Sequence, residues 1–464
     1  MKPVVTVAEM QAIDAEAHAE VEEAVLVERA GTALATWALR LMGGSYGRRV
    51  VVIAGKGNNG ADGRVAAARI RRRGAAVQVI EAAEAPSRIG PSGAVDLVID
   101  AAYGTGFRGT YRAPAVYPGV RVLAADIPSG VNGDTGEACD ETLRADLTVT
   151  FAALKPGLLQ GDGPLLAGRV EVADIGLDVS KAHLWVVEDA DVPRLLPVRG
   201  RCAYKWQSAI AVVAGSPGMT GAAELCTRGA YRAGAGMVRL GVPGADLAEL
   251  GVTEAVGAVL PAEQWASAAL EMAARCKALV VGPGLGRGAD SISQVRQLVA
   301  EAPVPVVVDA DGLFALGTAE DVATVVRERG SRIVPDIVLT PHDGEFARMT
   351  GSAPGKDRIC DVTRLAAASG AVVLLKGPTT VVARPDGGAL LAVAGSPRLA
   401  TAGTGDVLSG VIGAFLARGL APLEAAAFAA HVHARGAQLG PAEGLVAGDV
   451  ADLIARWLSG VRRG

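Results

Sequence analysis

The strongest chemical signal in the sequence is a loop of small residues followed by one carboxylate. Residues 400–410 read Ala-Thr-Ala-Gly-Thr-Gly-Asp-Val-Leu-Ser-Gly and run into an apolar segment, Val407 to Leu416. That segment predicts a helix, and a helix N-terminus favours an anion because free N–H groups and the helix dipole meet there. Asp406 would stand beside the anion and suits a general base for a hydroxyl. The alternative is a plain strand-to-helix turn with a capping aspartate.

A second loop of this kind stands in the first half of the chain. A β-branched run at 49–54 leads into Gly-Lys-Gly-Asn-Asn-Gly-Ala-Asp-Gly at 55–63, and a helix is predicted from Arg64 to Arg73. Strand, glycine loop and helix together make a phosphate-binding geometry. The side-chain oxygens of Asn58, Asn59 and Asp62 in this loop suit a cation. The alternative is an ordinary turn between a strand and a helix.

Two further strands of the first half are followed by polar side chains. The strand predicted at 96–100 ends in Asp100 and leads into a glycine loop with one arginine, while the strand predicted at 120–125 is followed by Asp126 and Ser129. Ligands of parallel sheets bind at the carboxyl ends of the strands. With the asparagines of the first loop, these groups predict one ligand pocket, whereas a single such aspartate often only caps a helix.

The elements that position these residues alternate between strand and helix. In the second half the strands are predicted at 208–214, 278–281, 304–308, 337–340 and 372–375, each followed by a polar or glycine-rich loop. This alternation is typical of α/β layers. His342 follows the fourth of these strands beside two carboxylates, so we expect ligand contact rather than a loop cap. Lys376 follows the fifth and brings an ammonium group to the strand end, where it can balance a phosphate.

The N-terminal region is predicted to be one helix from Thr6 to about Met42. Thr6 and Glu9 have the spacing of a capping box. We expect His18 on this helix to have a surface or packing role. A proline-containing charged segment at 189–201 predicts the domain boundary, which gives domains of residues 1–188 and 189–464.

Composition excludes several classes of protein. The chain has 464 residues, which predicts two or three domains, and a net charge of −4, which gives no reason to expect a nucleic-acid partner. The five cysteines have no paired spacing for zinc or disulfides. We expect no signal peptide, because the first residues lack a basic region followed by an apolar stretch, and no apolar run reaches the roughly 18 residues that span a bilayer. We therefore expect a cytoplasmic protein without a membrane partner. The alanine-rich segment at 421–434 suggests a homo-oligomer, and burial in the core explains its composition equally well.

On these motifs the first half resembles the YjeF N-terminal domain, the NAD(P)H-hydrate epimerase family. The matching stretches are 57–63, 100–106, 126–130, 145–151 and 155–157, and the resemblance covers about residues 1–180. It implies a K⁺ ion held by Asn59, Asp100 and Ser129, and Asp126 as the candidate acid/base. It also implies a hydrate site made by Asn58, Asn59, Gly60, Ala61, Asp62, Gly104, Thr105, Gly106, Phe107, Arg108, Gly109 and Thr110. The family usually has glycine where Ala61 stands.

The second half resembles the ribokinase-like superfold and, within it, the ADP/ATP-dependent NAD(P)H-hydrate dehydratase family. The matching stretches are 282–286, 309–311, 339–346, 376–377 and 400–410. The resemblance implies hydrate contacts from Ala223, Gly284, His342 and Asp406. Contacts to ADP or ATP, with Mg²⁺, would come from Lys376, Gly377, Pro378, Thr379, Thr380, Gly403, Thr404 and Gly405. Two departures from the family are Ala402 in place of a glycine, and Tyr204-Lys205-Trp206 in place of His-Lys-Gly.

Together the halves predict a Rossmann-like three-layer domain followed by a ribokinase-like α/β/α domain. This order is characteristic of the bifunctional NAD(P)H-hydrate repair enzymes, which implies epimerisation of the R and S hydrates and nucleotide-dependent dehydration of the S hydrate. One alternative is a small-molecule kinase for a vitamin precursor, because that superfold shares Gly-Thr-Gly-Asp. Another is a binding role for the first domain, but the charge and the scarcity of basic clusters with interleaved aromatic residues argue against nucleic acid.

Overall fold

The computed structural model describes residues 1–90, 95–246, 251–330 and 336–461, and these residues form two compact units. One unit contains Lys2–Leu184 with the short segment Lys356–Arg358. The other contains Met1, Trp185–Gly355 and Ile359–Gly464. Within the described residues no helix is long and apolar enough to cross a membrane.

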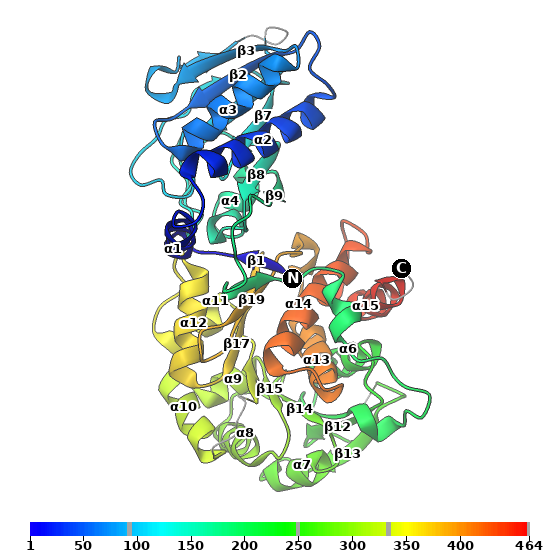
Figure 1. The fold of residues 1–464 in the computed structure, drawn as a ribbon. Helices are drawn as coiled ribbons and strands as arrows, with labels where there is room; N and C mark the ends of the chain where they lie inside the picture. Colours follow the sequence, from blue (N-terminus) through cyan, green and yellow to red (C-terminus); the bar gives the residue numbers. More distant parts are fainter. Residues whose placement is uncertain (91–94, 247–250, 331–335, 462–464) are drawn as a thin grey trace. The chain divides into compact units, whose positions relative to one another are not determined.

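The N-terminal unit is built on a parallel sheet with strand order β3-β2-β5-β7-β8-β9 (Figure 1). Alternate residues of β2 enter two different cores: Val50 and Val52 pack with helices α2 and α3, and Val51 and Ile53 pack with irregular segments on the other face. The strands are β1 (Lys2–Val4), β2 (Arg49–Ala54), β3 (Ala76–Glu81), β4 (Arg88–Ile89), β5 (Leu97–Ala101), β6 (Ala115–Val116), β7 (Arg121–Ala125), β8 (Leu147–Phe151) and β9 (Arg169–Ala173). Strand β10 (Leu184–Val186) follows at the boundary, and most of it belongs to the C-terminal unit. The helices are α1 (Val7–Ala17), α2 (Glu23–Met42), α3 (Asn58–Arg72) and α4 (Gly163–Leu166), with 3₁₀ turns η1 (Ala82–Glu84) and η2 (Pro156–Leu158).

The single helix predicted from Thr6 to Met42 is wrong, because two helices occupy that range. The capping box at Thr6 and Glu9 is confirmed and starts α1. Met10 of α1 packs in a small cluster with Val5, whereas the buried residues of α2 belong to the larger core under the sheet. Two helices with different packing partners need different axes, so the chain turns between them.

Helix α3 starts earlier than its sequence pattern indicates. The sequence predicts the helix from Arg64, directly after the glycine loop at 55–63. In the structure α3 begins at Asn58, so the asparagines form its first turn and Gly57 is the cap. A Cβ atom on Gly60 would lie 1.9 Å from the carbonyl oxygen of Gly55, so this first turn presses against the end of β2.

The C-terminal unit contains a sheet with the order β10-β19-β18-β17-β16-β15-β14-β11-β12-β13. Its pairs are parallel from β13 to β17, whereas β17, β18 and β19 pair antiparallel as two consecutive hairpins that the sequence did not predict. The strands are β11 (Ala209–Val213), β12 (Met237–Pro243), β13 (Val256–Leu260), β14 (Ala278–Val281), β15 (Val306–Val308), β16 (Ile337–Leu339), β17 (Val372–Leu375), β18 (Thr380–Ala383) and β19 (Ala389–Ala392).

Helices cover both faces of this sheet, with α8, α9, α10 and α12 on one side and α13 and α14 on the other (Figure 1). The helices are α5 (Asp191–Leu195), α6 (Gly221–Arg232), α7 (Ala266–Ala273), α8 (Ala289–Glu301), α9 (Asp311–Leu316), α10 (Ala319–Glu328), α11 (Asp343–Thr350), α12 (Arg358–Ser369), α13 (Thr404–Ala417), α14 (Pro422–Gln438) and α15 (Ala447–Val461), with 3₁₀ turns η3 (Lys205–Ser208) and η5 (Pro397–Leu399).

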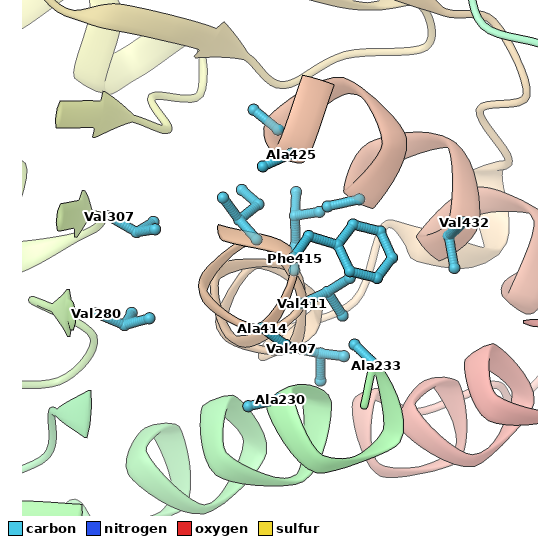
Figure 2. Packing of buried hydrophobic residues seen from close by; sticks show 14 of the residues in the cluster. Ala230, Ala233, Val280, Val307, Val407, Val411, Ala414, Phe415, Ala425 and Val432 are labelled. Carbon is cyan, nitrogen blue, oxygen red and sulfur yellow. The ribbon is translucent and has the colours of Figure 1, made fainter. Parts of the chain in front are cut away.

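Helix α13 is the central helix of the C-terminal unit. Every residue of it is buried except Gly405 and Asp406 in its first turn. Figure 2 shows Phe415 and its neighbours between the sheet and helices α6 and α14. A Cβ on Gly410 would lie 1.9 Å from the carbonyl oxygen of Cys226, so α6 and α13 touch backbone to backbone. This anchoring fixes the position of Asp406.

The alanine-rich segment at 421–434 lies in the same core. Nearly every residue of α14 is buried within its own unit. Burial therefore accounts for the apolar composition, and the segment no longer supports self-association.

Candidate functional sites

The N-terminal unit contains a cavity of about 640 Å³ at the carboxyl ends of β2, β5 and β7. Its wall includes many of the residues expected to bind the hydrate, namely Asn58, Asn59, Asp62, Gly104, Thr105, Gly106, Phe107 and Arg108, together with Asp126. Gly60, Ala61, Gly109 and Thr110 are not part of the wall. The three strand-end motifs thus meet at one pocket.

Asp126 is held rigidly at the floor of this cavity. Its backbone is in the left-handed region, with φ of 66°, which is strained for a residue with a side chain. Oδ2 accepts hydrogen bonds from the backbone N–H of Thr105 at 2.9 Å and from the hydroxyl of the same residue, and Oδ1 accepts one from the Thr150 hydroxyl at 3.1 Å. Each contact fixes the direction of the carboxylate.

Lys155 forms an ion pair with Asp126 that the sequence reading missed. Its Nζ lies 2.7 Å from Oδ1 of Asp126, and its side chain is 1% exposed. Nζ also donates to the Thr150 hydroxyl at 2.9 Å and to the Phe151 carbonyl at 2.8 Å. Burial alone would raise the pKa of Asp126, but the Lys155 charge and the hydrogen bonds bring it below its usual value. Asp126 is therefore an ionised proton acceptor at neutral pH.

A second carboxyl in the cavity has the opposite character. Asp62 is 6% exposed and lines the same wall. Burial, followed by the negative charge of Asp126, raises the pKa of Asp62 to about 8. The cavity thus combines an ionised carboxylate with a protonated carboxyl, a separation typical of acid/base sites.

The three residues expected to hold K⁺ offer oxygen atoms beside this cavity. Asp100 is fully buried, and its two oxygens accept from the Ser129 hydroxyl at 2.6 Å and the Ser129 N–H at 2.9 Å. In the part of the chain that is described, neither side-chain atom of the Asn59 amide has a hydrogen-bond partner, although both are buried. An unpartnered buried carbonyl and a buried carboxylate are both groups that fit a cation preferring oxygen, although of the three residues only Asn59 is part of the cavity wall.

In the C-terminal unit, Asp406 and Lys376 belong to one charged cluster. Gly403, with φ of 90°, caps α13 and places Gly405 and Asp406 in its first turn. A Cβ on Gly405 would lie 3.3 Å from Nζ of Lys376. Burial, then the charge of Asp309, raises the pKa of Asp406 to about 7, and Lys376 partly opposes the rise. A carboxyl with this pKa can exchange a proton near neutral pH.

Asp309 is the residue that organises this cluster. It is almost fully buried; Oδ1 accepts from Nζ of Lys376 at 2.6 Å and Oδ2 accepts from the Ser409 hydroxyl at 2.7 Å. The sequence reading noted Asp309 only as part of a motif and gave it no role. The sequence signal that could have indicated this pairing is an aspartate and a lysine that each follow one of two nearby parallel strands.

Ala223 and Gly284 lie together next to the end of β11. The N–H of Gly215 donates to the carbonyl of Pro283 at 2.7 Å, and a Cβ on Gly284 would lie 3.1 Å from the Cβ of Ala222. Ala223 is fully buried, so any ligand contact would need close approach to this tight turn. Thr379 precedes β18, and Thr380 is its first residue.

His342 is the N-cap of α11. Its Nδ1 accepts hydrogen bonds from the N–H groups of Gly344 at 3.0 Å and Glu345 at 3.3 Å, which is the capping role weighed against ligand contact. The other ring nitrogen lies 3.6 Å from Oε1 of Glu345, on a side chain that is 60% exposed. Ligand contact through that nitrogen stays a prediction.

Comparison with known proteins gives matches over both units. The family model described as NAD(P)H-hydrate dehydratase matches residues 210–458, and the model of the YjeF-related protein N-terminus matches residues 23–92 and 81–157. The bifunctional NAD(P)H-hydrate repair enzyme of Mycobacterium leprae is 40% identical over 489 residues, covering 100% of this chain and 99% of that protein. The chain belongs to the bifunctional NAD(P)H-hydrate repair enzyme family.

A second relative supports this assignment, and one solved structure shares the fold of the second half. The repair enzyme of Moorella thermoacetica is 35% identical over 97% of this chain and 95% of its own length. A ribokinase-like superfamily protein from Enterococcus faecalis has a TM-score of 0.52 at 19% identity and covers 61% of this chain and 98% of its own. That likeness supports the fold expected for the second half, and the α/β fold class is confirmed.

Proposed function

We propose that the two units divide the repair of hydrated NADH and NADPH between them. The N-terminal unit interconverts the R and S hydrates, and the C-terminal unit uses ADP or ATP to return the S hydrate to the reduced cofactor. The supporting observation is that each unit carries its own carboxylate prepared for proton transfer, Asp126 in one and Asp406 in the other. The chain divides between these activities at about residues 188 and 189.

The cavity suits a hydrated nicotinamide nucleotide. A volume of about 640 Å³ lies within the usual range for small-molecule sites. Arg108 supplies a positive charge on its wall, and the rings of Tyr103 and Phe107 lie 5.0 Å apart at the same loop. The cation can balance a phosphate and the aromatic faces can stack on a ring. Asp126 is the acid/base group at C6 of the nicotinamide ring.

We propose that K⁺ is held by the oxygens of Asn59, Asp100 and Ser129. When bound, the ion would supply positive charge for the diphosphate of the substrate. The hydrogen bonds between Ser129 and Asp100 hold two of these ligand oxygens in place, and the buried amide oxygen of Asn59 would gain the ion as its partner. Mg²⁺ would accompany the phosphates of the adenine nucleotide at the C-terminal site.

In the C-terminal unit the reaction begins at the C6 hydroxyl. Asp406 takes its proton, the oxygen attacks the terminal phosphorus of the nucleotide, and the phosphoanhydride bond breaks to release AMP (from ADP) or ADP (from ATP). The N–H groups of Gly403, Thr404 and Gly405 and the ammonium of Lys376 stabilise the charge on the transferred group. Phosphate then leaves C6 as a proton leaves C5, and the ring double bond returns.

The activity is tested with the purified S hydrate. Full-length protein is incubated with Mg²⁺ and either ADP or ATP, and recovery of absorbance at the reduced-nicotinamide band is followed. We expect recovery with at least one nucleotide, and the faster one is the preferred donor. A stable phosphorylated product without recovery would instead support a small-molecule kinase. The cytoplasmic location and a homo-oligomeric state are proposals from the sequence and are tested by fractionation and sedimentation.

A further inference from the structure

Helix α1 forms one wall of the N-terminal cavity. Val7, Met10, Gln11, Asp14 and His18 line it, and their spacing places them on one face of the helix. His18, for which we expected a surface or packing role, is therefore at the cavity as well as exposed. The match to the YjeF-related N-terminus begins at residue 23, after this helix.

Helix α1 is held in place by contacts next to Lys155. Val5, just before the helix, donates its N–H to the carbonyl of Leu154 at 2.9 Å, and Met10 packs with Val5 and Ala153. The N–H of Val7 is bound by a carboxylate oxygen of Asp134 at 2.8 Å. The helix is thus docked on the segment that carries Lys155, and Asp14 is close enough that the charges of Lys155 and Asp126 affect its pKa.

Epimerisation at C6 has a geometric requirement. The hydroxyl leaves from one face of the nicotinamide ring and water adds to the other, so two groups on different sides of the ring must exchange protons with oxygen. Asp126 and Asp62 both belong to the wall made by the strand ends and the first turns of α3. Among the cavity residues, Asp14 is the carboxyl group that α1 supplies.

We propose that Asp14 is the second proton-transferring group of the epimerase reaction and works on the face of the ring opposite Asp126. In one direction the neutral carboxyl of Asp14 protonates the C6 hydroxyl. The C6–O bond breaks, water leaves, and the lone pair on N1 forms a C6=N1 iminium. A water molecule then attacks C6 from the other face, and the Asp126 carboxylate accepts its proton. The reverse direction exchanges the two roles, and nothing is consumed.

The direction of the pKa shift of Asp14 agrees with this role. Burial raises the pKa of Asp14, while the charges of Lys155 and His18 oppose the rise. In either direction one carboxyl is protonated and the other ionised, so the rate has a bell-shaped dependence on pH. The titratable or charged groups that face Asp14 across the cavity are His18, Glu23, Asp62, Arg108, Asp126 and Lys155.

The test compares Asp14→Asn with Glu16→Gln in the full-length protein. Glu16 is a matched control because it lies on the same helix but is largely exposed, with Oε1 3.3 Å from Nζ of Lys181. Conversion of purified R hydrate into S hydrate is measured without nucleotide. Asp14→Asn is expected to lower kcat about 100-fold with little change in KM, and to remove the alkaline limb of the pH profile. Asp14→Glu should recover part of the rate, and Glu16→Gln should match the wild type.

The inference rests on the proposed epimerase activity, and the two can fail separately. If the wild type does not interconvert the hydrates, the proposed epimerase function and this inference both fall. If the wild type is active and Asp14→Asn stays within about threefold of it, with both limbs of the pH profile present, only the role of Asp14 falls. A variant that loses affinity for the hydrate and keeps kcat would also overturn it. Dehydration of the S hydrate with nucleotide checks that each variant is folded.

Discussion

Replacing Lys155 by methionine should make the stability of the N-terminal unit depend on pH in a new way. The ammonium is 1% exposed and lies 2.7 Å from Oδ1 of Asp126. Methionine keeps most of the volume and removes the charge. Taking one partner from a buried ion pair costs about 3–5 kcal/mol, because the other charge stays buried without compensation. Asp126 will avoid part of that cost by binding a proton.

The direction of the pH effect follows from the pKa of Asp126. In the wild type this pKa is lowered, so the ionised group stabilises the fold above the unfolded pKa of about 3.9, and this is lost as the pH falls through the folded value. In Lys155→Met the folded pKa lies above the unfolded one, since burial is then opposed only by hydrogen bonds. The destabilisation therefore grows as the pH rises from about 4 towards the new folded pKa.

Hydrogen exchange of β2, β5 and β7 at pH 5 and pH 8 measures the opening free energy of this unit by itself. We expect the difference in opening free energy between wild type and Lys155→Met to be larger at pH 8 than at pH 5 by at least about 1 kcal/mol. This is a low bound, because a shift of one pKa unit corresponds to about 1.4 kcal/mol. The acid limb of the epimerase pH profile should move upwards in the variant. Equal differences at both pH values, with an unmoved acid limb, would refute the role given to Lys155.

Three further predictions concern the glycine contact, the C-terminal carboxylate and the cation. Gly410→Ala should destabilise the C-terminal unit by about 1–3 kcal/mol in denaturant unfolding and slow dehydration, because its Cβ would meet the backbone of Cys226. The control is Gly460→Ala, at an exposed helical position with open space around it. It should be neutral or stabilise the protein by up to about 1 kcal/mol in the same assay. The dehydration rate should rise through pH 7 as Asp406 ionises, and Asp406→Asn should lower it at least about 100-fold, which a pH–rate series checks. Replacing K⁺ by tetramethylammonium should weaken hydrate binding in a titration, and Asn59→Ala should bind weakly in either salt; equal affinity of the wild type in both salts would contradict the proposed site.

The sequence predicted the parts of the fold that depend on local pattern. The strands at 278–281 and 372–375 were placed correctly because they are short apolar runs between glycine and polar loops. The start of α3 was misplaced because its first turn is polar and packs through Gly60 against the backbone. The turn between α1 and α2 was missed because their difference lies in packing partners and leaves no proline or glycine signal.

The residues of the candidate sites likewise fall into those that a local pattern identifies and those that only tertiary contacts reveal. Asp126 and Asp406 were identified because each follows a strand or opens a helix in a recognisable loop. Lys155 and Asp309 received no role, since their importance comes from partners 29 and 67 residues away in the chain, at Asp126 and Lys376. Asp14 was missed because only the docking of α1 brings it to the cavity. Pairings of this kind depend on tertiary contacts.

The most direct test of the two-unit account uses a mixture of both hydrate epimers with Mg²⁺ and the preferred nucleotide. The wild type should restore the reduced-nicotinamide absorbance completely. Asp126→Asn should stop, on the timescale of the wild-type reaction, at the share contributed by the S hydrate, and Asp406→Asn should restore almost none. Mixing the two variants should bring back full recovery, because each supplies the unit that the other lacks. Complete recovery by Asp126→Asn at the wild-type rate, or none by the wild type with either nucleotide, would contradict the account.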